Sequence, residues 1–231
     1  MKRFYSNTLP LLLDSDSRHA IKALRCKESD CIEVIDGNGK LYQATILSIS
    51  RNEIQLSDLK IIKAEENNTQ LLSIAIAPTK NPARIEWFVE KATEIGVRNI
   101  YPIITERTEK HTIKLERLQQ IIISATKQSK HLYLPTIHEI SNFKNFIQQQ
   151  LPEQKFIAHC TQNSNPPQIQ ELYKKNTELI ICIGPEGDFT NSEVQLAHQN
   201  QFLEISLGNS ILRTETAGVF VCSAIRMLNN L

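Results

Sequence analysis

The larger, C-terminal part of the chain is built from short apolar runs that alternate with segments of helical periodicity. The run at residues 71–77 is almost wholly apolar and ends at Pro78, a pattern typical of a strand buried on both faces of a parallel sheet. Apolar residues then recur at helical spacing between Pro82 and Gly96, which suit the first helical position and the C-cap. Strands that alternate with helices in this way predict an α/β fold with a parallel sheet.

The same alternation continues along the chain and defines a domain that we place at residues 69–231. We expect further strands at 98–105, 155–160, 179–183 and 202–207, and further helices at 113–130, 141–150, 192–200 and 215–228. These segments contain no internal repeat.

Residues 1–68 have a different pattern, with short strands and no long helical segment. Two alternating runs, Cys31–Ile35 and Leu41–Ile46, flank the turn sequence Asp36-Gly37-Asn38-Gly39, which favours a hairpin. Further strands are expected at 49–56 and 59–63. Several short strands at this spacing predict a small β-barrel domain, followed by a polar linker at 65–69.

Composition places the chain among ordinary soluble proteins, with 41% hydrophobic and 22% charged residues in 231. No stretch approaches the roughly 20 apolar residues that span a bilayer. Ser6, Asn7 and Pro10 interrupt the N-terminal apolar run, so we expect no signal peptide, no membrane partner and a cytoplasmic location. The five cysteines form no C-x-x-C pair and have no histidine at metal-ligand spacing, so we expect neither disulfides nor a metal.

Charge is distributed unevenly, although the net charge is only +1. Residues 78–131 carry ten Lys or Arg against six acids, whereas residues 152–207 carry three against seven. A basic and an acidic region allow a polyanion to bind in one orientation. From charge alone, an uneven but solvated surface is the preferred interpretation.

The segment Ile180–Thr190, IICIGPEGDFT, runs from a strand through a glycine-rich turn into a helix. Thr190 or Asn191 is the expected N-cap, with Glu193 placed for a capping box. In an open α/β sheet, ligands bind beyond the carboxyl ends of the strands, where this turn would lie. The turn lacks the G-x-G-x-x-G and P-loop patterns, and alone it fits an ordinary strand–helix connection equally well.

A second strand–loop–helix segment, Leu207–Gly218, has the sequence LGNSILRTETAG. Its presence favours a functional role for the first segment. Thr214 suits the N-cap, and Glu215 suits the positive end of the helix dipole. Arg213 does not suit its position, because the helix dipole disfavours a cation at the start of a helix. We therefore expect an anionic partner for it. Two such turns predict one shared crevice.

The two segments resemble the C-terminal signatures of the RsmE family, the 16S ribosomal RNA uridine-N3 methyltransferases. The family pattern is close to IGPEGG-[FL]-[ST]-x-x-E followed by LG-x-x-ILR-x-ETA. The resemblance extends over essentially the whole chain through the segments Arg3-Phe4, His19, Leu24-Arg25, Asp36-Gly37, Arg84–Val97, Thr105–Arg107, Gln128-Ser129 and Pro135. Three positions depart from the pattern: Asp188 replaces the last glycine of GPEGG, Lys130-His131 replaces Gly-Arg, and Ser210 replaces a common basic residue.

The resemblance implies an N-terminal PUA-like β-barrel and a C-terminal SPOUT methyltransferase domain with a trefoil-knotted parallel sheet. It also implies S-adenosylmethionine as cofactor, 16S rRNA or the small ribosomal subunit as partner, a homodimer and no metal. Threaded chains are so rare that periodicity alone would not predict the knot.

The resemblance also assigns roles to residues of this chain. The expected cofactor-binding residues are Ile183, Gly184, Pro185, Glu186, Gly187, Leu207, Gly208, Ile211, Leu212, Thr216 and Ala217. The expected RNA-binding residues are Arg3, His19, Arg25, Lys80, Lys91, Arg107, Gln128 and Lys130, although Lys91 also fits a solvated helix surface. The expected catalytic residues are Arg213, which would stabilise the uracil anion, and Glu215, which is either the general base or, as we favour, a support for Arg213.

Two other functions are compatible with these loops. One is another SPOUT-type reaction, such as ribose 2′-O methylation, and the other is RNA binding without catalysis. The nearly complete ILRTETAG motif argues against the second, because a protein that only binds RNA does not need a cofactor loop.

Overall fold

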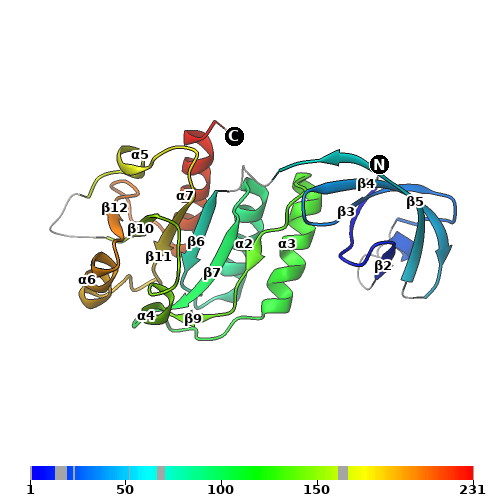
Figure 1. Cartoon of the computed structure of the whole chain (residues 1–231). Helices are drawn as coiled ribbons and strands as arrows, with labels where there is room; N and C mark the ends of the chain where they lie inside the picture. The colour runs from blue at the N-terminus through cyan, green and yellow to red at the C-terminus, as the bar shows by residue number, and fades with distance from the viewer. Residues whose placement is uncertain are drawn as a thin grey trace. The chain divides into compact units, whose positions relative to one another are not determined.

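The computed structural model contains two compact units (Figure 1). The residues that it describes are 2–13, 20–22, 24–51, 53–66, 71–160 and 166–230. The first unit comprises Met1–Asn67 and Ile123–Leu134, and the second comprises Asn68–Ile122 and Pro135–Leu231. The segment Ile123–Leu134 therefore belongs to the first unit, whereas the sequence pattern places it in the second domain.

The first unit is built on a five-stranded sheet in the order β1-β3-β4-β5-β2. The strands are β1 (Arg3–Tyr5), β2 (Leu11–Leu13), β3 (Cys31–Ile35), β4 (Lys40–Ile49) and β5 (Glu53–Ala64). The predicted hairpin is confirmed: β3 and β4 pair antiparallel, and Asp36 Oδ1 accepts hydrogen bonds from Asn38 N at 2.8 Å and Lys40 N at 3.0 Å. The two strands expected after residue 49 are instead the single long strand β5, whose register shifts against β4 let it bend.

The segment Ile123–Leu134 joins the first unit through the hairpin turn. Leu134 N donates to Gly37 O at 3.0 Å, and Gly39 N donates to Leu132 O at 3.1 Å. Gly37 and Gly39 have φ of 76° and 95°, and a Cβ at Gly39 would collide with the Tyr133 hydroxyl. The turn therefore needs glycine both for its backbone conformation and for this close approach.

The second unit contains the predicted parallel sheet, with seven strands in the order β12-β10-β11-β6-β7-β8 and β9 paired with β7. The strands are β6 (Leu72–Ile76), β7 (Asn99–Ile104), β8 (Thr136–Ile137), β9 (Ser141–Asn142), β10 (Gln154–Ala158), β11 (Leu179–Ile183) and β12 (Leu203–Ile205). Strands β6 and β11 are buried along their whole length, as their continuous apolar sequences predict.

Most expected helices are present, with small changes at their ends. They are α2 (Pro82–Ile95), α3 (Leu115–Ser129), α4 (Phe143–Phe146), α6 (Asn191–Gln199) and α7 (Thr214–Leu228), and the short α5 (Ile169–Leu172) is a helix that the sequence analysis did not predict. Asn81 is the N-cap of α2, and the predicted Gly96, with φ of 105°, is its C-cap. The helix expected over 141–150 is wrong except for α4, because Ser141 and Asn142 are extended and pair with β7.

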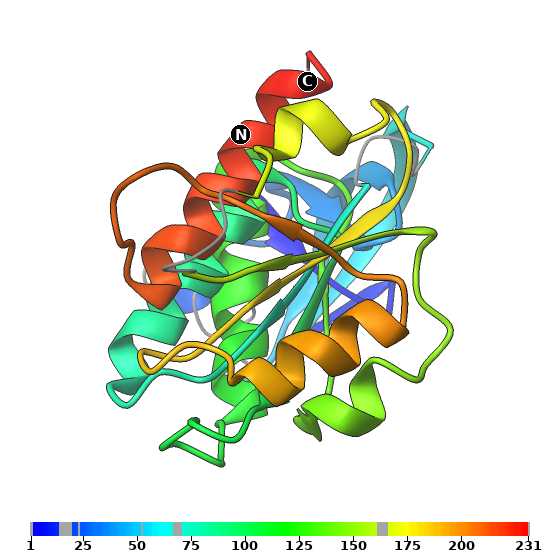
Figure 2. The same ribbon diagram turned by 90° about the vertical axis from the view of Figure 1, so that its left-hand side faces the viewer.

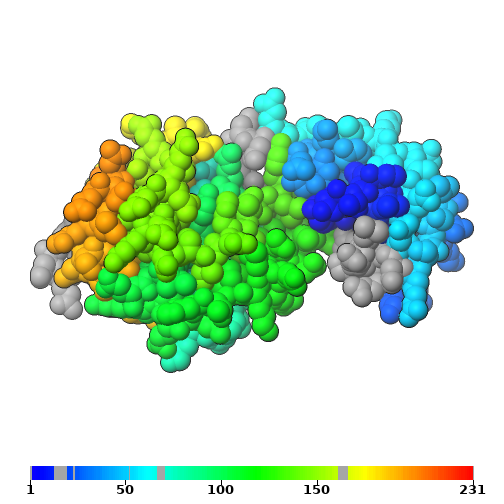
Figure 3. All heavy atoms as spheres, turned by 60° about the horizontal axis from the view of Figure 1, so that its bottom comes forward, coloured from blue at the N-terminus to red at the C-terminus, as the bar shows by residue number. Residues whose placement is uncertain are grey.

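Helices cover both faces of this sheet. Figure 2 shows α4 and α6 (orange) on one side and α2 and α7 (red) on the other. Alternate strand residues follow this division: Ala75 and Cys182 pack in the apolar cluster with α4 and α6, whereas Ile76 faces Gly218 of α7. On the surface in Figure 3, the α4 region (yellow-green) and the α6 region (orange) lie side by side.

Strand β12 has neighbours on both sides. It pairs with β10, and just after it Ser206 pairs with Gln168 and donates from N to Pro167 O at 3.0 Å. The chain before β12 is α6, and the chain after it leads to α7 on the other face of the sheet. The trefoil knot stays a prediction of the resemblance.

Candidate active site

Five loops meet at the carboxyl edge of the parallel sheet, after β6, β7, β10, β11 and β12. This is the edge at which open α/β sheets bind ligands. Both segments singled out in the sequence lie there: Gly184–Asp188 follows β11, and Ser206–Leu212 follows β12. We call these the first loop and the second loop.

The first loop ends in the predicted helix cap. Thr190 Oγ1 accepts from Glu193 N at 3.3 Å, and Thr190 N donates to Glu193 Oε2 at 2.9 Å, so the capping box is confirmed. The other oxygen of Glu193 accepts from Glu106 N at 2.8 Å, in the loop after β7. This buried carboxylate therefore fixes two loops at once.

Neighbouring loops also hold the first loop directly. Lys80 N, in the loop after β6, donates to Glu186 Oε1 at 3.2 Å. Arg107, in the loop after β7, donates from Nη1 to Gly187 O at 2.7 Å. A Cβ at Gly187 would lie only 3.2 Å from Arg107 Cβ, so glycine lets the arginine lie close against the loop backbone.

Thr214 joins the first loop to the second. Its buried hydroxyl donates to Gly184 O at 3.0 Å. The sequence predicts Thr214 as the N-cap of α7, but the N-cap is Arg213 and makes no side-chain cap hydrogen bond. The hydroxyl expected to cap the helix instead links the start of α7 to the first loop, a contact that local capping rules do not anticipate.

Arg213 is exposed at the start of α7. In the described part of the chain, no hydrogen bond or ion pair engages its guanidinium. Its charge is thus available to an anionic ligand.

Glu215 is paired with Arg84 at the start of α2. It is 7% exposed, and its Oε1 lies 3.7 Å from Nε of Arg84. Its Oε2 is buried without a hydrogen-bond partner. Arg84 Nη1 also lies 3.9 Å from Glu186 Oε1, so this arginine links the first loop to the start of α7. The sequence analysis assigned no role to Arg84, although it lies in the Arg84–Val97 segment that carries the resemblance.

The remaining cofactor candidates differ in accessibility. Ile183, Pro185 and Ala217 are buried, and Leu207 and Leu212 are half-buried. Ile211 is 86% exposed, and Gly187, Gly208 and Thr216 are also exposed. Gly208 has φ of 106°, and a Cβ there would meet nothing within 4 Å, so its backbone borders open space.

The described RNA candidates are divided between the two units: Arg3, Arg25, Gln128 and Lys130 belong to the first, and Lys80, Lys91 and Arg107 to the second. Three are engaged by acids: Arg3 with Glu33 at 2.9 Å, Lys80 with Glu109 at 2.9 Å, and Lys91 with Glu90 at 2.6 Å and Glu94 at 3.0 Å. Arg107 holds the first loop, as above. Arg25, Gln128 and Lys130 are exposed, and His19 lies outside the described residues.

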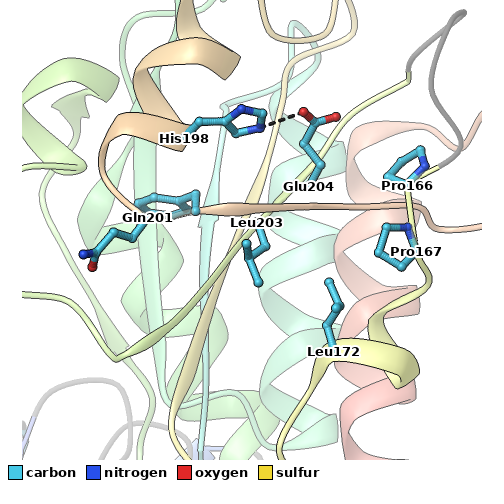
Figure 4. A pocket seen from close by; sticks show the side chains of 8 residues that line it. Pro166, Pro167, Leu172, His198, Gln201, Leu203 and Glu204 are labelled. Carbon is cyan, nitrogen blue, oxygen red and sulfur yellow. Dashed lines mark ion pairs between the residues drawn. The ribbon is translucent and has the colours of Figure 1, made fainter.

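A cavity of about 530 Å³ lies elsewhere, at the outer edge of β12 (Figure 4). Prolines, Leu172 and Leu203 form its apolar wall, and His198 Nε2 lies 2.6 Å from Glu204 Oε1 at its polar end. None of its lining residues belongs to the first or the second loop. Among the described residues there is also no metal-ligand cluster and no helix able to span a membrane.

Comparison with protein families gives two matches that together cover most of the chain. Residues 65–226 match the model of an RNA methyltransferase domain, and residues 12–59 match that of an RNA methyltransferase PUA domain. Ribosomal RNA small subunit methyltransferase E of Mesomycoplasma hyopneumoniae is 31% identical over 96% of this chain and 97% of its own length. The protein of the same name from Synechocystis is 29% identical over 90% of this chain and 69% of its own length.

Solved structures agree with these matches. A probable rRNA-methyltransferase from Porphyromonas gingivalis is 34% identical, with a TM-score of 0.91 over 100% of this chain and 99% of its own. Ribosomal RNA small subunit methyltransferase E from Neisseria gonorrhoeae, solved bound to S-adenosyl methionine, is 25% identical, with a TM-score of 0.84 over 99% of this chain and 98% of its own.

Proposed function

The chain belongs to the family of ribosomal RNA small subunit methyltransferases E, and we propose that it transfers the methyl group of S-adenosylmethionine to N3 of a uridine in 16S ribosomal RNA. Membership of this family makes it an S-adenosylmethionine-dependent rRNA methyltransferase. The observation that carries the assignment of the site is the Thr214–Gly184 contact, which joins the two loops beside the unpaired guanidinium of Arg213.

The residues of the two loops fit this cofactor. Exposed backbone at Gly208 offers hydrogen-bonding groups without a side chain in the way. The exposed carboxylate of Glu186 borders the same edge and favours a positively charged ligand, whereas that of Glu215 is buried beside Arg84. When bound, the cofactor supplies an activated methyl group on a sulfonium.

Arg213 has the chemistry that the acceptor requires. Methylation at N3 of uracil removes the N3 proton and leaves negative charge on the ring and its two flanking carbonyl oxygens. A guanidinium presents several donors in a fixed plane, so Arg213 can stabilise this charge as it develops. Its position before a helix N-terminus, where a cation has no structural benefit, is explained by this role.

For Glu215 we propose a supporting role, with Arg84 as its partner. The Arg84 guanidinium lies beside one oxygen of this carboxylate. The same arginine reaches Glu186, and the three side chains together fix the start of α7 against the first loop. Glu215 then determines where Arg213 lies without itself accepting the N3 proton.

We further propose a cytoplasmic homodimer whose first domain, residues 1–68, docks the small-subunit RNA. Large apolar side chains on α2 and α7 support a protein interface, since Trp87, Phe220 and Met227 are 43%, 47% and 77% exposed. Helices α2 and α7 pack against each other, so one partner surface can cover both.

Nucleoside analysis tests the reaction. Ribosomal RNA from a deletion strain should lack one 3-methyluridine, and the purified protein should restore it with S-adenosylmethionine. Loss of a 2′-O-methyl nucleoside instead would favour the alternative SPOUT-type reaction, and retention of all modifications would contradict the proposal. Absence of S-adenosylmethionine binding at millimolar cofactor in calorimetry would exclude both reactions.

Arg213→Ala tests the role of the guanidinium. We expect kcat to fall by about 100-fold or more, the size of effect seen when one charge-stabilising donor is removed. Cofactor affinity, measured by calorimetry, should change little. Equal losses in kcat and in affinity would make Arg213 a cofactor-binding residue.

A further inference from the structure

Asp188 is the position at which the first loop departs from the GPEGG pattern that it resembles. Its φ is 60°, in the left-handed region that glycine adopts without strain and that other residues rarely adopt. Aspartate and asparagine tolerate this region best, because their side chains can bond to nearby backbone. A non-glycine residue here at a functional edge calls for a compensating interaction.

The carboxylate of Asp188 makes that interaction. Its Oδ2 accepts from Cys160 N at 2.8 Å, and its Oδ1 accepts from Phe189 N at 2.8 Å. A Cβ built on Gly184 would lie 3.3 Å from Asp188 Oδ1 and 3.1 Å from the Phe189 ring. The side chain of Asp188 therefore packs over Gly184, in space that only glycine at that position leaves free.

The contact with Cys160 crosses between two loops. Cys160 follows β10 and Asp188 follows β11, and these strands are neighbours in the sheet. Glycine at position 188 has no side chain to make this link. Together with Thr214, which joins the first loop to the start of α7, Asp188 connects the loops after β10, β11 and β12.

We propose that Asp188 is a positioning residue for the cofactor, which holds the backbone at Cys160 against the first loop and so preorganises the carboxyl edge of the sheet. The inference rests on the proposed function, since it assigns the cofactor to these loops. Asp188 acts through the backbone that it bonds and does not take part in the chemical step. Its loss should therefore weaken cofactor binding and leave turnover at saturating cofactor nearly unchanged.

Cys160 provides a second, independent readout. Burial raises the pKa of the Cys160 thiol, and the charge of Asp188 raises it further. Removing that charge should move the pH midpoint of Cys160 alkylation downwards. Cys31 is the other exposed cysteine, so the measurement is made in a Cys31→Ser background, and Cys26, Cys182 and Cys222 are buried.

The test compares Asp188→Gly and Asp188→Asn with the unmodified protein by calorimetry with S-adenosylmethionine. Asp188→Gly should bind about tenfold more weakly, the effect of losing one hydrogen bond to a charged group. Asp188→Asn, which keeps the left-handed backbone and one acceptor, should lie between the two. The matched control is Asp58→Gly, which replaces an aspartate with φ of 53° in the first unit and should leave cofactor affinity unchanged.

The outcomes separate this inference from the function on which it rests. Normal binding by the unmodified protein together with unchanged affinity in Asp188→Gly would overturn the inference alone. An unchanged alkylation midpoint in Asp188→Asn would also overturn it, because the contact with Cys160 would then be absent. Failure of the unmodified protein to bind S-adenosylmethionine would overturn the proposed function and this inference with it.

Discussion

Gly218 lies where α7 packs closest to α2, and its replacement by alanine sets two effects against each other. A Cβ at this position would lie 2.5 Å and 2.7 Å from two ring carbons of Phe88 and 3.3 Å from Ile76 Cδ1. Favourable carbon contacts are at about 3.5–4.0 Å, so the ring or the helix must move by roughly 1 Å. Phe88 is fully buried, and its ring has no free space to enter.

The gain in helix propensity can be compared with the cost of overpacking. Alanine is favoured over glycine within a helix by about 1 kcal/mol. Overpacking of a well-packed core costs about 1–3 kcal/mol. Because the clash involves two ring atoms of a buried side chain, we expect the upper part of that range. Gly218→Ala should therefore lower the free energy of unfolding by about 1–2 kcal/mol, which follows from the difference between these terms.

Urea unfolding measures this change, followed by the fluorescence of Trp87, the single tryptophan, which lies on α2. Phe88→Leu provides the control, because a smaller side chain removes the clash. The double variant should lose less stability, relative to Phe88→Leu, than Gly218→Ala loses relative to the unmodified protein. A midpoint for Gly218→Ala equal to or above that of the unmodified protein would refute the reasoning.

Two further predictions concern stability. Asn229 ends α7 and is buried, with Nδ2 donating to Tyr173 OH at 3.0 Å and Oδ1 accepting from Asn176 N at 2.9 Å. Asn229→Ala leaves Asn176 N unpaired and removes one partner of the Tyr173 hydroxyl, so it should cost about 1–3 kcal/mol in urea unfolding. Tyr173→Phe should cost less, and equal stability in all three proteins would argue against the network. His138 stacks on Tyr101 at 4.0 Å, and burial lowers its pKa from the usual 6.5. As the pH falls, the unfolded chain binds a proton at His138 before the folded chain does. The free energy of unfolding should therefore fall below about pH 6.5, until His138 is protonated in the folded state too. His138→Gln should remove that part of the pH dependence, and identical stability profiles for the two proteins would contradict the prediction.

Features set by neighbouring residues could be read from the sequence. The cap formed by Thr190 and Glu193 and the helix end at Gly96 are correct because each depends on residues within one helical turn. The hairpin at Asp36 is correct for the same reason. The parallel sheet follows from the long apolar runs, which only a sheet covered on both faces can bury.

Features that depend on residues far apart in the chain could not be predicted from the sequence. Arg84 and Glu215 are far apart in the sequence, and nothing local shows that the first turn of α2 lies against the start of α7. Likewise, helical spacing at 141–150 did not reveal that Ser141 and Asn142 pair with β7. Tertiary contacts determined both outcomes.

The pairing of β12 bears on how this protein folds. Strand β12 pairs with β10, and Ser206 beside it donates to Pro167 O. These contacts join residues far apart in the chain, a property that slows folding, whereas the helices depend on residues close in sequence. The second loop follows β12 directly, so its position depends on this pairing. We therefore expect a refolding chain to recover its helices before it recovers cofactor binding.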